Sequence, residues 1–181
     1  MKLLFCGDVQ GCFSDFFRKL QTLNQSAHGP FDACFCTGSF FLAPPAPNAD
    51  SEDADTREET AKEALERLRT WEGQVPLSVY FVLGEDRRSD CIRTALSTDT
   101  NKDGQLISNV HFLGNAGVKN VKGLQVGYLS GIQDASGYTA SASENDKTIT
   151  REEVNHVLTT AKESNLELGI DILLTSQWPY K

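Results

Sequence analysis

Short apolar segments alternate with longer amphipathic ones along the first half of this chain, and this order narrows the folds it can adopt. Apolar segments of strand length cover residues 2–6, 31–37 and 77–83. Between them, residues 13–23 and 57–71 carry apolar side chains at helical spacing. The pattern predicts a strand–helix–strand–helix–strand unit, which is the basis of an α/β fold.

The second predicted helix has the clearest two-sided pattern. Ala61, Leu65 and Leu68 share one face of the helix. Glu63 and Arg67 stand one turn apart on the other side. We expect them to form an i,i+4 ion pair.

After residue 83 the pattern changes to short strands separated by Gly or Asn, which indicates hairpins: residues 110–113, 118–121 and 124–129. Thr150 and Glu153 form a capping box that predicts a helix running to about residue 164. A wholly apolar last strand covers residues 169–174. These elements predict an α/β fold, a layered αβ sandwich with mixed β-sheets. We expect one domain over residues 1–181, with residues 43–56, rich in Pro, Ala and Asp, as a loop insertion.

Four predicted strands end in small or polar groups where their apolar runs stop: Gly7-Asp8, Gly38-Ser39, Gly84-Glu85-Asp86 and Thr175-Ser176. In open α/β sheets, ligands bind outside the carboxyl ends of the strands. Glycine there lets the backbone approach a ligand closely. Four such loops predict a site at one edge of the sheet, and the alternative is that each group only makes a turn.

The side chains at this predicted site are carboxylates and neutral polar groups: Asp8, Gln10, Ser39, Glu85, Asp86 and Ser176. A two-metal phosphoesterase centre needs several carboxylates and several imidazoles. No histidine lies in the four loops, because the three in the chain are His28, His111 and His156. We therefore predict no catalytic residue and no two-metal centre. The carboxylates Asp8, Glu85 and Asp86 leave room for one weakly held Mg²⁺, Mn²⁺ or Ca²⁺.

Two further groups of residues could bind metals. The five cysteines lack the Cys-x2-Cys spacing of a zinc site, so we expect buried, reduced thiols, with Cys34 and Cys36 on opposite faces of their strand. Residues 99–104 match the opening of an EF-hand loop, but Val110 stands where the final Glu ligand belongs. We expect a polar turn there, with a calcium-binding module as the alternative.

Charge and hydropathy indicate the class of partner. The net charge of −8 gives no broad basic surface, so we expect no strong direct binding of nucleic acid. No apolar run approaches the ~20 residues that span a bilayer, so we expect no membrane partner. The expected partner is another protein.

Five segments carry a family resemblance: Gly7–Phe13, Gly38–Phe41, Leu83-Gly84, Tyr128–Gly131 and Asp171–Pro179. In this order they resemble the amino-terminal domain of the CwfJ-type (Cwf19-like) spliceosome-associated proteins, relatives of the lariat-debranching-enzyme-associated factor. The last segment, an apolar strand running into Thr-Ser-x-Trp-Pro, is the most specific. The resemblance covers nearly the whole chain.

The resemblance implies a fold similar to calcineurin-like metallophosphoesterases, the debranching enzyme among them. Where active members carry metal ligands, this chain has Gln10, Ser39, Glu85-Asp86 and Ser176, and Asp8 alone is retained. The final Gly-His-x-His motif would lie beyond Lys181. The resemblance therefore implies a retained fold with a dismantled metal site.

Resemblance and ligand chemistry together predict an inactive metallophosphoesterase-like domain that acts as a protein-interaction module in pre-mRNA splicing and intron lariat turnover. We expect splicing or lariat-debranching proteins as partners, in the nucleus and also in the cytoplasm. Phe40, Phe41 and Trp178 are candidate contact points, because exposed aromatic residues often anchor interfaces. Packing in the core is the other interpretation of these aromatics. The alternative function is a residual single-metal phosphodiesterase acting on RNA or nucleotides.

Overall fold

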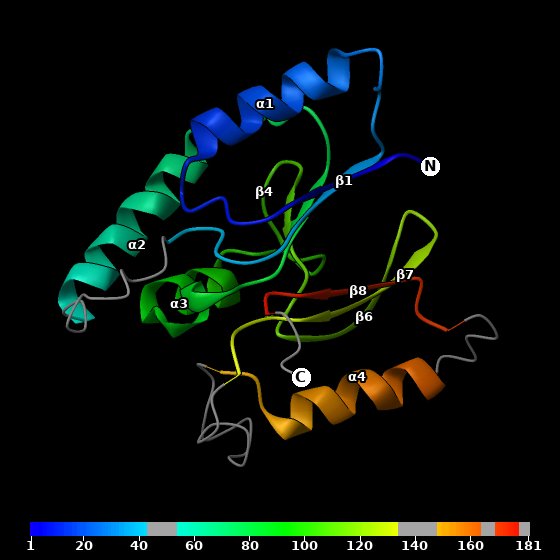
Figure 1. Ribbon diagram of the computed structural model, residues 1–181. Coiled ribbons are helices and arrows are strands. Elements are labelled where there is room, and N and C mark those ends of the chain that lie inside the picture. The colour runs from blue at the N-terminus through cyan, green and yellow to red at the C-terminus, as the bar shows by residue number, and fades with distance from the viewer. Residues whose placement is uncertain (43–53, 134–147, 164–168, 178–181) are drawn as a thin grey trace.

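A computed structural model of the chain describes residues 1–42, 54–133, 148–163 and 169–177 (Figure 1). Its first sheet contains five strands, in the spatial order β1 (Leu3–Cys6), β2 (Ala33–Cys36), β3 (Val79–Phe81), β5 (Val110–Phe112) and β4 (Gln105–Ile107). β1, β2, β3 and β5 run parallel, and β4 pairs antiparallel with β5. The parallel part contains the predicted strand–helix–strand–helix–strand unit.

The second sheet has three strands, in the order β6 (Ala116–Val121), β7 (Leu124–Leu129) and β8 (Ile172–Thr175). β6 and β7 form an antiparallel hairpin, and β8 joins β7 in parallel. Both sheets therefore mix the two directions, which confirms the predicted α/β sandwich with mixed sheets.

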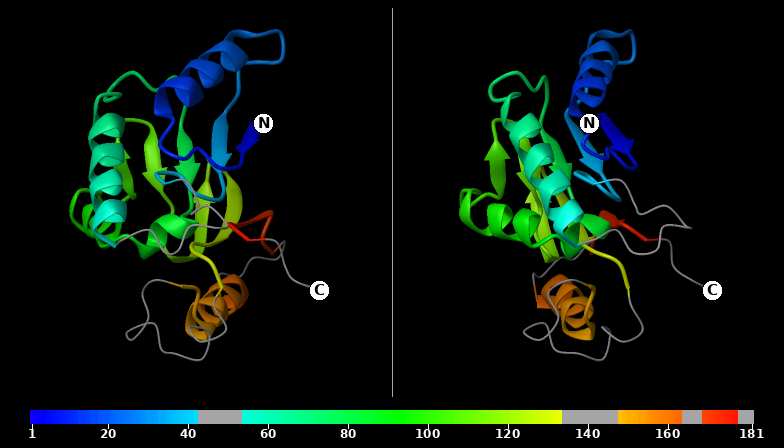
Figure 2. Two further views of the ribbon diagram at one scale, coloured as in Figure 1. Left: turned by 60° about the vertical axis from the view of Figure 1, so that its left-hand side comes forward. Right: turned by 90° about the vertical axis from the view of Figure 1, so that its left-hand side faces the viewer.

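Four α-helices and one short 3₁₀ helix connect these strands in the described residues: α1 (Phe13–Gln25), α2 (Ala54–Arg69), η1 (Glu85–Arg88), α3 (Asp90–Thr98) and α4 (Arg151–Glu163). α1, α2 and α3 lie on one side of the molecule, and α4 lies beyond the second sheet (Figures 1 and 2). The order of layers is helices, first sheet, second sheet and α4. None of the described helices is both long and apolar enough to cross a membrane.

Two hydrophobic cores hold these layers together. The larger core joins the apolar faces of α1, α2 and α3 to one face of the first sheet, and it includes Phe17, Leu68, Phe81 and Ile92. The smaller core lies between the sheets, where Phe35 of the first sheet shares a cluster with side chains of the second. Alternation along the strands separates the two cores, because neighbouring side chains point to opposite faces.

Two side-chain interactions predicted from the sequence are present in the structure. α2 covers Ala54–Arg69 where residues 57–71 were predicted, and Glu63 and Arg67 form the expected ion pair at 3.5 Å. The capping box also forms, since the Thr150 N–H donates to Glu153 at 2.9 Å and the Glu153 N–H donates to the Thr150 hydroxyl at 3.3 Å.

The structure differs from the expected elements in several places. Residues 110–113 were expected in a hairpin with the strands that follow; β5 does form an antiparallel hairpin, but with β4, which precedes it, and it joins the first sheet by parallel pairing with β3. The helix α3 and the strand β4 were not expected. The segment before residue 99 is α3, and a polar turn joins it to β4. Most of the expected loop insertion over residues 43–56, residues 43–53, lies outside the described residues, and residues 54–56 are the first turn of α2 instead of loop.

Candidate functional site

The loops after β1 and β2 are joined by the carboxylate of Asp8. Its Oδ1 accepts the Ser39 N–H at 2.7 Å. Gly38 adopts a φ of 89°, and a Cβ on it would lie 2.1 Å from the same oxygen. Only glycine fits this close approach without moving Asp8. Here the glycine after a strand lets the backbone approach a carboxylate of the chain itself.

The Ser39 backbone also contacts the rest of the loop after β1 and the loop after β3. Its carbonyl accepts the Val9 N–H at 2.9 Å and the Gln10 N–H at 3.0 Å. Gly84, after β3, is packed so tightly that a Cβ on it would lie 3.0 Å from the Ser39 nitrogen. The predicted convergence of the first three loops is therefore present, and backbone contacts bring it about.

Asp86 lies at the centre of these loops, and its side chain is fully buried. One carboxylate oxygen accepts the Phe40 N–H at 2.6 Å, and the other accepts the N–H groups of Phe41 at 3.1 Å and Leu42 at 2.6 Å. A hydrogen bond to an ionised acceptor contributes about 1.5–3 kcal/mol. Burial raises the pKa of Asp86 to about 6, while these donated hydrogen bonds lower it. The carboxylate therefore fixes the segment after β2.

This segment directs Phe40 and Phe41 into the core, so their prediction as exposed contact points is wrong. Each side chain is 1% exposed. The Phe40 ring stacks on Phe81 of β3 with centroids 4.2 Å apart, and the Phe41 ring meets Phe81 edge-on at 5.7 Å. The bonds from Asp86 hold the backbone in the orientation that buries both rings. The third contact point, Trp178, lies outside the described residues.

A buried ion pair ties the loop after β3 to the second sheet and to α4. The Arg87 side chain is 1% exposed and meets Glu153 of α4 through two bonds, at 2.6 and 3.2 Å. Its guanidinium also donates to the Ser130 carbonyl at 2.8 Å. The Ser130 hydroxyl donates to the Gly114 carbonyl at 2.6 Å. No sequence pattern predicts this network, because nothing in Glu85-Asp86-Arg87-Arg88 indicates that Arg87 is buried while Arg88 is partly exposed.

The fourth predicted loop joins the others through Gly131. The Ser176 hydroxyl donates to the Gly131 carbonyl, and the Gly131 N–H donates to the Leu83 carbonyl at 2.5 Å. Ser176 thus connects the end of β8 to the end of β3. All four loops expected at one edge are linked, either directly or through this residue.

The remaining predicted site residues lie at the rim. Glu85 pairs with Arg88 at 3.3 Å. The atom in this ion pair, Oε2, is buried, and within the described part of the chain it makes no hydrogen bond in addition to the charge contact. Gln10 is exposed and adopts a φ of 54°. Its carbonyl accepts the thiol of Cys12 at 3.7 Å.

The side chains at this site do not fit the ligand set of a two-metal centre. Both oxygens of Asp86 accept backbone N–H groups, as does Oδ1 of Asp8. Among the described residues, no group of three or more His, Cys, Asp and Glu side chains is arranged to hold a metal ion. The ring of His111 instead stacks on Tyr80 of the neighbouring strand at 4.9 Å. Burial and the nearby Lys119 lower the pKa of His111.

The turn at residues 99–104 uses its polar groups internally. Asp99 forms an ion pair with Arg69. The Asn101 side-chain oxygen accepts the N–H groups of Asp103 at 2.9 Å and Gln105 at 3.1 Å. This is the expected polar turn, with these side chains turned towards the protein's own groups.

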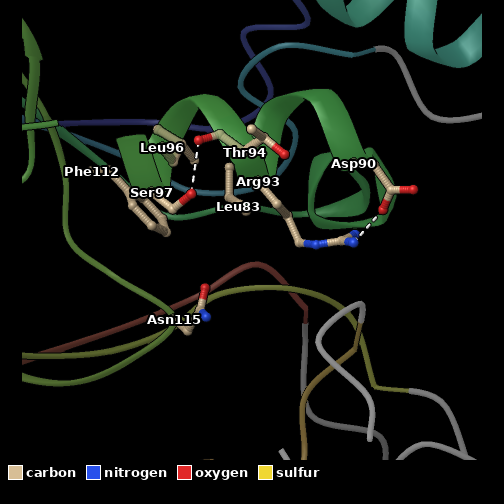
Figure 3. A pocket seen from close by; sticks show the side chains of 8 residues that line it. All are labelled: Leu83, Asp90, Arg93, Thr94, Leu96, Ser97, Phe112 and Asn115. Carbon is tan, nitrogen blue, oxygen red and sulfur yellow. Dashed lines mark hydrogen bonds and ion pairs between the residues drawn. The ribbon is translucent and has the colours of Figure 1, made fainter. Parts of the chain in front are cut away.

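A hollow of about 490 Å³ opens beside the linked loops, between α3 and the start of the second sheet (Figure 3). Leu83, Leu96 and Phe112 supply its apolar lining. Arg93 also lines it, and its guanidinium pairs with Asp90 and donates to the Arg87 carbonyl at 2.9 Å. The hollow therefore combines an apolar wall with a charged pair that is internally balanced.

α3, which forms one wall of this hollow, had a recognisable start signal. The Ser89 hydroxyl caps the helix by accepting the Ile92 N–H at 3.3 Å. The Glu58 carboxylate of α2 accepts the N–H groups of Asp90 at 2.8 Å and Cys91 at 2.6 Å. Ser89-Asp90 followed by Ile92 and Leu96 is a helix-start pattern that could have predicted α3. Glu58 could not have been predicted, because it comes from another helix.

No family model matches this chain, but several known proteins are similar to it over nearly its whole length. CWF19-like protein 1 homolog of Drosophila melanogaster is 31% identical over 99% of this chain and 30% of its own length. CWF19-like protein 1 of Mus musculus is 31% identical over 99% of this chain and 28% of its own length. Zinc finger CCCH domain-containing protein 64 of Arabidopsis thaliana is 30% identical over 98% of this chain and 27% of its own length. The chain thus spans 27–30% of the length of these relatives.

Proposed function

This chain belongs to the CWF19-like protein family, and from that premise we propose that it is a catalytically silent, phosphoesterase-like domain that docks on other proteins. The proposed partners are splicing or lariat-debranching proteins, in the nucleus and also in the cytoplasm. The proposed fold relation is to calcineurin-like phosphoesterases. The two-sheet sandwich, with its loops gathered at the strand ends, supports that relation.

One observation carries the catalytic part of this proposal: the carboxylates of the site accept the chain's own backbone N–H groups. Asp86 is bonded by three of them and is buried, so it would have to give up these bonds to face a cation. Asp8 is exposed but bonded to Ser39. A phosphoesterase needs several ligand groups free to face two cations. The donor chemistry at this site supports a structural role instead.

The charge of the chain supports proteins, rather than RNA, as direct partners. A net charge of −8 repels a phosphate backbone and favours a partner surface that carries basic residues. We therefore propose that the domain makes no strong direct contact with RNA and contributes to RNA processing through a protein it binds.

Two assays test this function. In the first, the chain is incubated with a simple phosphodiester in Mg²⁺ or Mn²⁺, beside an Asp8→Asn variant. We expect hydrolysis at the rate of the metal-only blank for both. Metal-dependent hydrolysis that disappears in Asp8→Asn would establish the alternative, a single-metal phosphodiesterase.

The second assay titrates the chain against purified lariat-debranching enzyme and purified splicing proteins, with and without EDTA. We expect saturable binding to one of them that EDTA leaves unchanged, because the site is held by hydrogen bonds. A matched titration with RNA should show binding only at low salt. Tight, salt-resistant RNA binding without protein binding would contradict the docking role.

A further inference from the structure

Three thiols lie together at the start of the linked loops. Cys34 and Cys36 of β2 both belong to the core beneath α1, and Cys6 of β1 packs against the same core. The expectation that Cys34 and Cys36 face opposite ways is wrong, because side chains two residues apart in a strand point to the same face. All five cysteines are free, and Cys34 and Cys36 are buried while Cys6 is partly exposed.

Cys6 and Cys36 are direct partners across two neighbouring parallel strands. Both side chains lie on the same face of the sheet, since Cys36 belongs to the core beneath α1 and Cys6 packs against that core. Adjacent strands lie about 4.7–4.9 Å apart. That spacing falls within the window of about 4.4–6.8 Å for the Cα atoms of a disulfide. Backbone register and side-chain direction therefore both favour a bridge between these residues.

The third thiol is less well placed to compete. Cys34 is fully buried, and it stands two residues from Cys36 along the same strand. That separation corresponds to about 6.6 Å, near the outer limit for a disulfide. Cys12 is exposed but follows the loop after β1, away from the strand pair. Cys6 is thus the thiol of the cluster that an oxidant in solution can reach, and Cys36 is its register partner on the neighbouring strand.

We infer that Cys6 and Cys36 are an oxidation site, which closes to a cross-strand disulfide on exposure to hydrogen peroxide. The Cys6 sulfur attacks the O–O bond and becomes a sulfenic acid, and one water leaves. The Cys36 thiol then attacks that sulfur, the S–S bond forms, and a second water leaves. The two thiols lose two electrons, and one peroxide is reduced to two waters.

The bridge would act on the site described above. Cys6 directly precedes Gly7-Asp8, and Cys36 precedes the turn that presents the Ser39 N–H to Asp8. A covalent link at the start of both loops reduces the freedom of the segments they carry, residues 7–11 and 37–42. Oxidation is therefore expected to slow amide hydrogen exchange in these two segments.

The test is oxidation of the purified 181-residue chain with stoichiometric hydrogen peroxide, followed by alkylation of the remaining thiols and mass spectrometry. We expect two of the five thiols to resist alkylation with a mass loss of about 2 Da, and dithiothreitol to restore both. Cys6→Ser should abolish the bridge, and Cys36→Ser should do the same. Cys12→Ser and Cys34→Ala are the matched controls, and both should still lose two thiols.

Two results would overturn this inference. One is an unchanged loss of two thiols in Cys6→Ser, which assigns the bridge to another pair. The other is oxidation confined to Cys12 in the wild-type chain while Cys6 and Cys36 remain open to alkylation. Cys6 lies on an edge strand and is partly exposed, so Cys6→Ser carries the test if Cys36→Ser does not fold. Circular dichroism of each variant establishes its folding beforehand.

Discussion

The buried pair between Arg87 and Glu153 gives the sharpest test of how this fold is held together, and Glu153→Gln is the variant to make. Glutamine can still close a capping box at this helix start, so the variant spares much of the local role of Glu153. It removes the negative charge that faces a guanidinium 1% exposed to solvent. The perturbation therefore acts mainly on the link between α4 and the loop after β3.

The expected cost follows from the burial of Arg87. Breaking a buried ion pair by removing one partner costs about 3–5 kcal/mol, because the remaining charge is left uncompensated. The Ser130 carbonyl stays bonded to Arg87 and offsets part of this, which favours the lower end. A domain of this size is stable by about 5–15 kcal/mol. The variant should therefore fold, with a clearly lower urea midpoint.

The matched control is Glu63→Gln, which removes a carboxylate from an ion pair on the surface of α2. The side chains of Glu63 and Arg67 are 62% and 52% exposed, so their loss should cost at most about 0.5 kcal/mol. Urea unfolding followed by circular dichroism compares both variants with the wild type at pH 7. If Glu153→Gln unfolds within about 1 kcal/mol of Glu63→Gln, the assigned role of the buried pair is refuted.

Three other outcomes are expected. Gly38→Ala places a Cβ against Asp8 and should cost more in urea unfolding than Gly73→Ala, where φ is also positive but the space is open; equal losses would show that backbone conformation alone matters. Phe40→Ala should cost about 3–5 kcal/mol in the same assay, because it empties a core position, and a loss below about 1 kcal/mol would contradict its burial. The raised pKa of Asp86, about 6 in the fold against 3.8 for the ordinary group, means that the native state binds more protons between these values. Stability should therefore fall as pH rises from about 4 to about 6, by on the order of 3 kcal/mol, and then level off. The difference in unfolding free energy between wild type and Asp86→Asn should follow that curve, and a difference that is flat with pH would contradict it.

The sequence by itself determined what depends on neighbours in the chain. The spacing of apolar residues predicted α1 and α2, and the Thr150–Glu153 box predicted the start of α4. Small or polar groups after the strands predicted where loops would meet, because the carboxyl ends of parallel strands share one edge. In these cases the structure depends on interactions between residues that are close together in the chain.

Only the tertiary structure decided which partner each polar group takes. Asp86 bonds to backbone groups 44 to 46 positions away, and Arg87 pairs with a residue 66 positions away. Such partners are chosen by how the two sheets and α4 pack, and no local pattern encodes that packing. The same packing buried Phe40 and Phe41, which the chain order alone left as either contacts or core. It also set Cys6 beside Cys36, since register between strands is fixed by pairing and not by sequence distance.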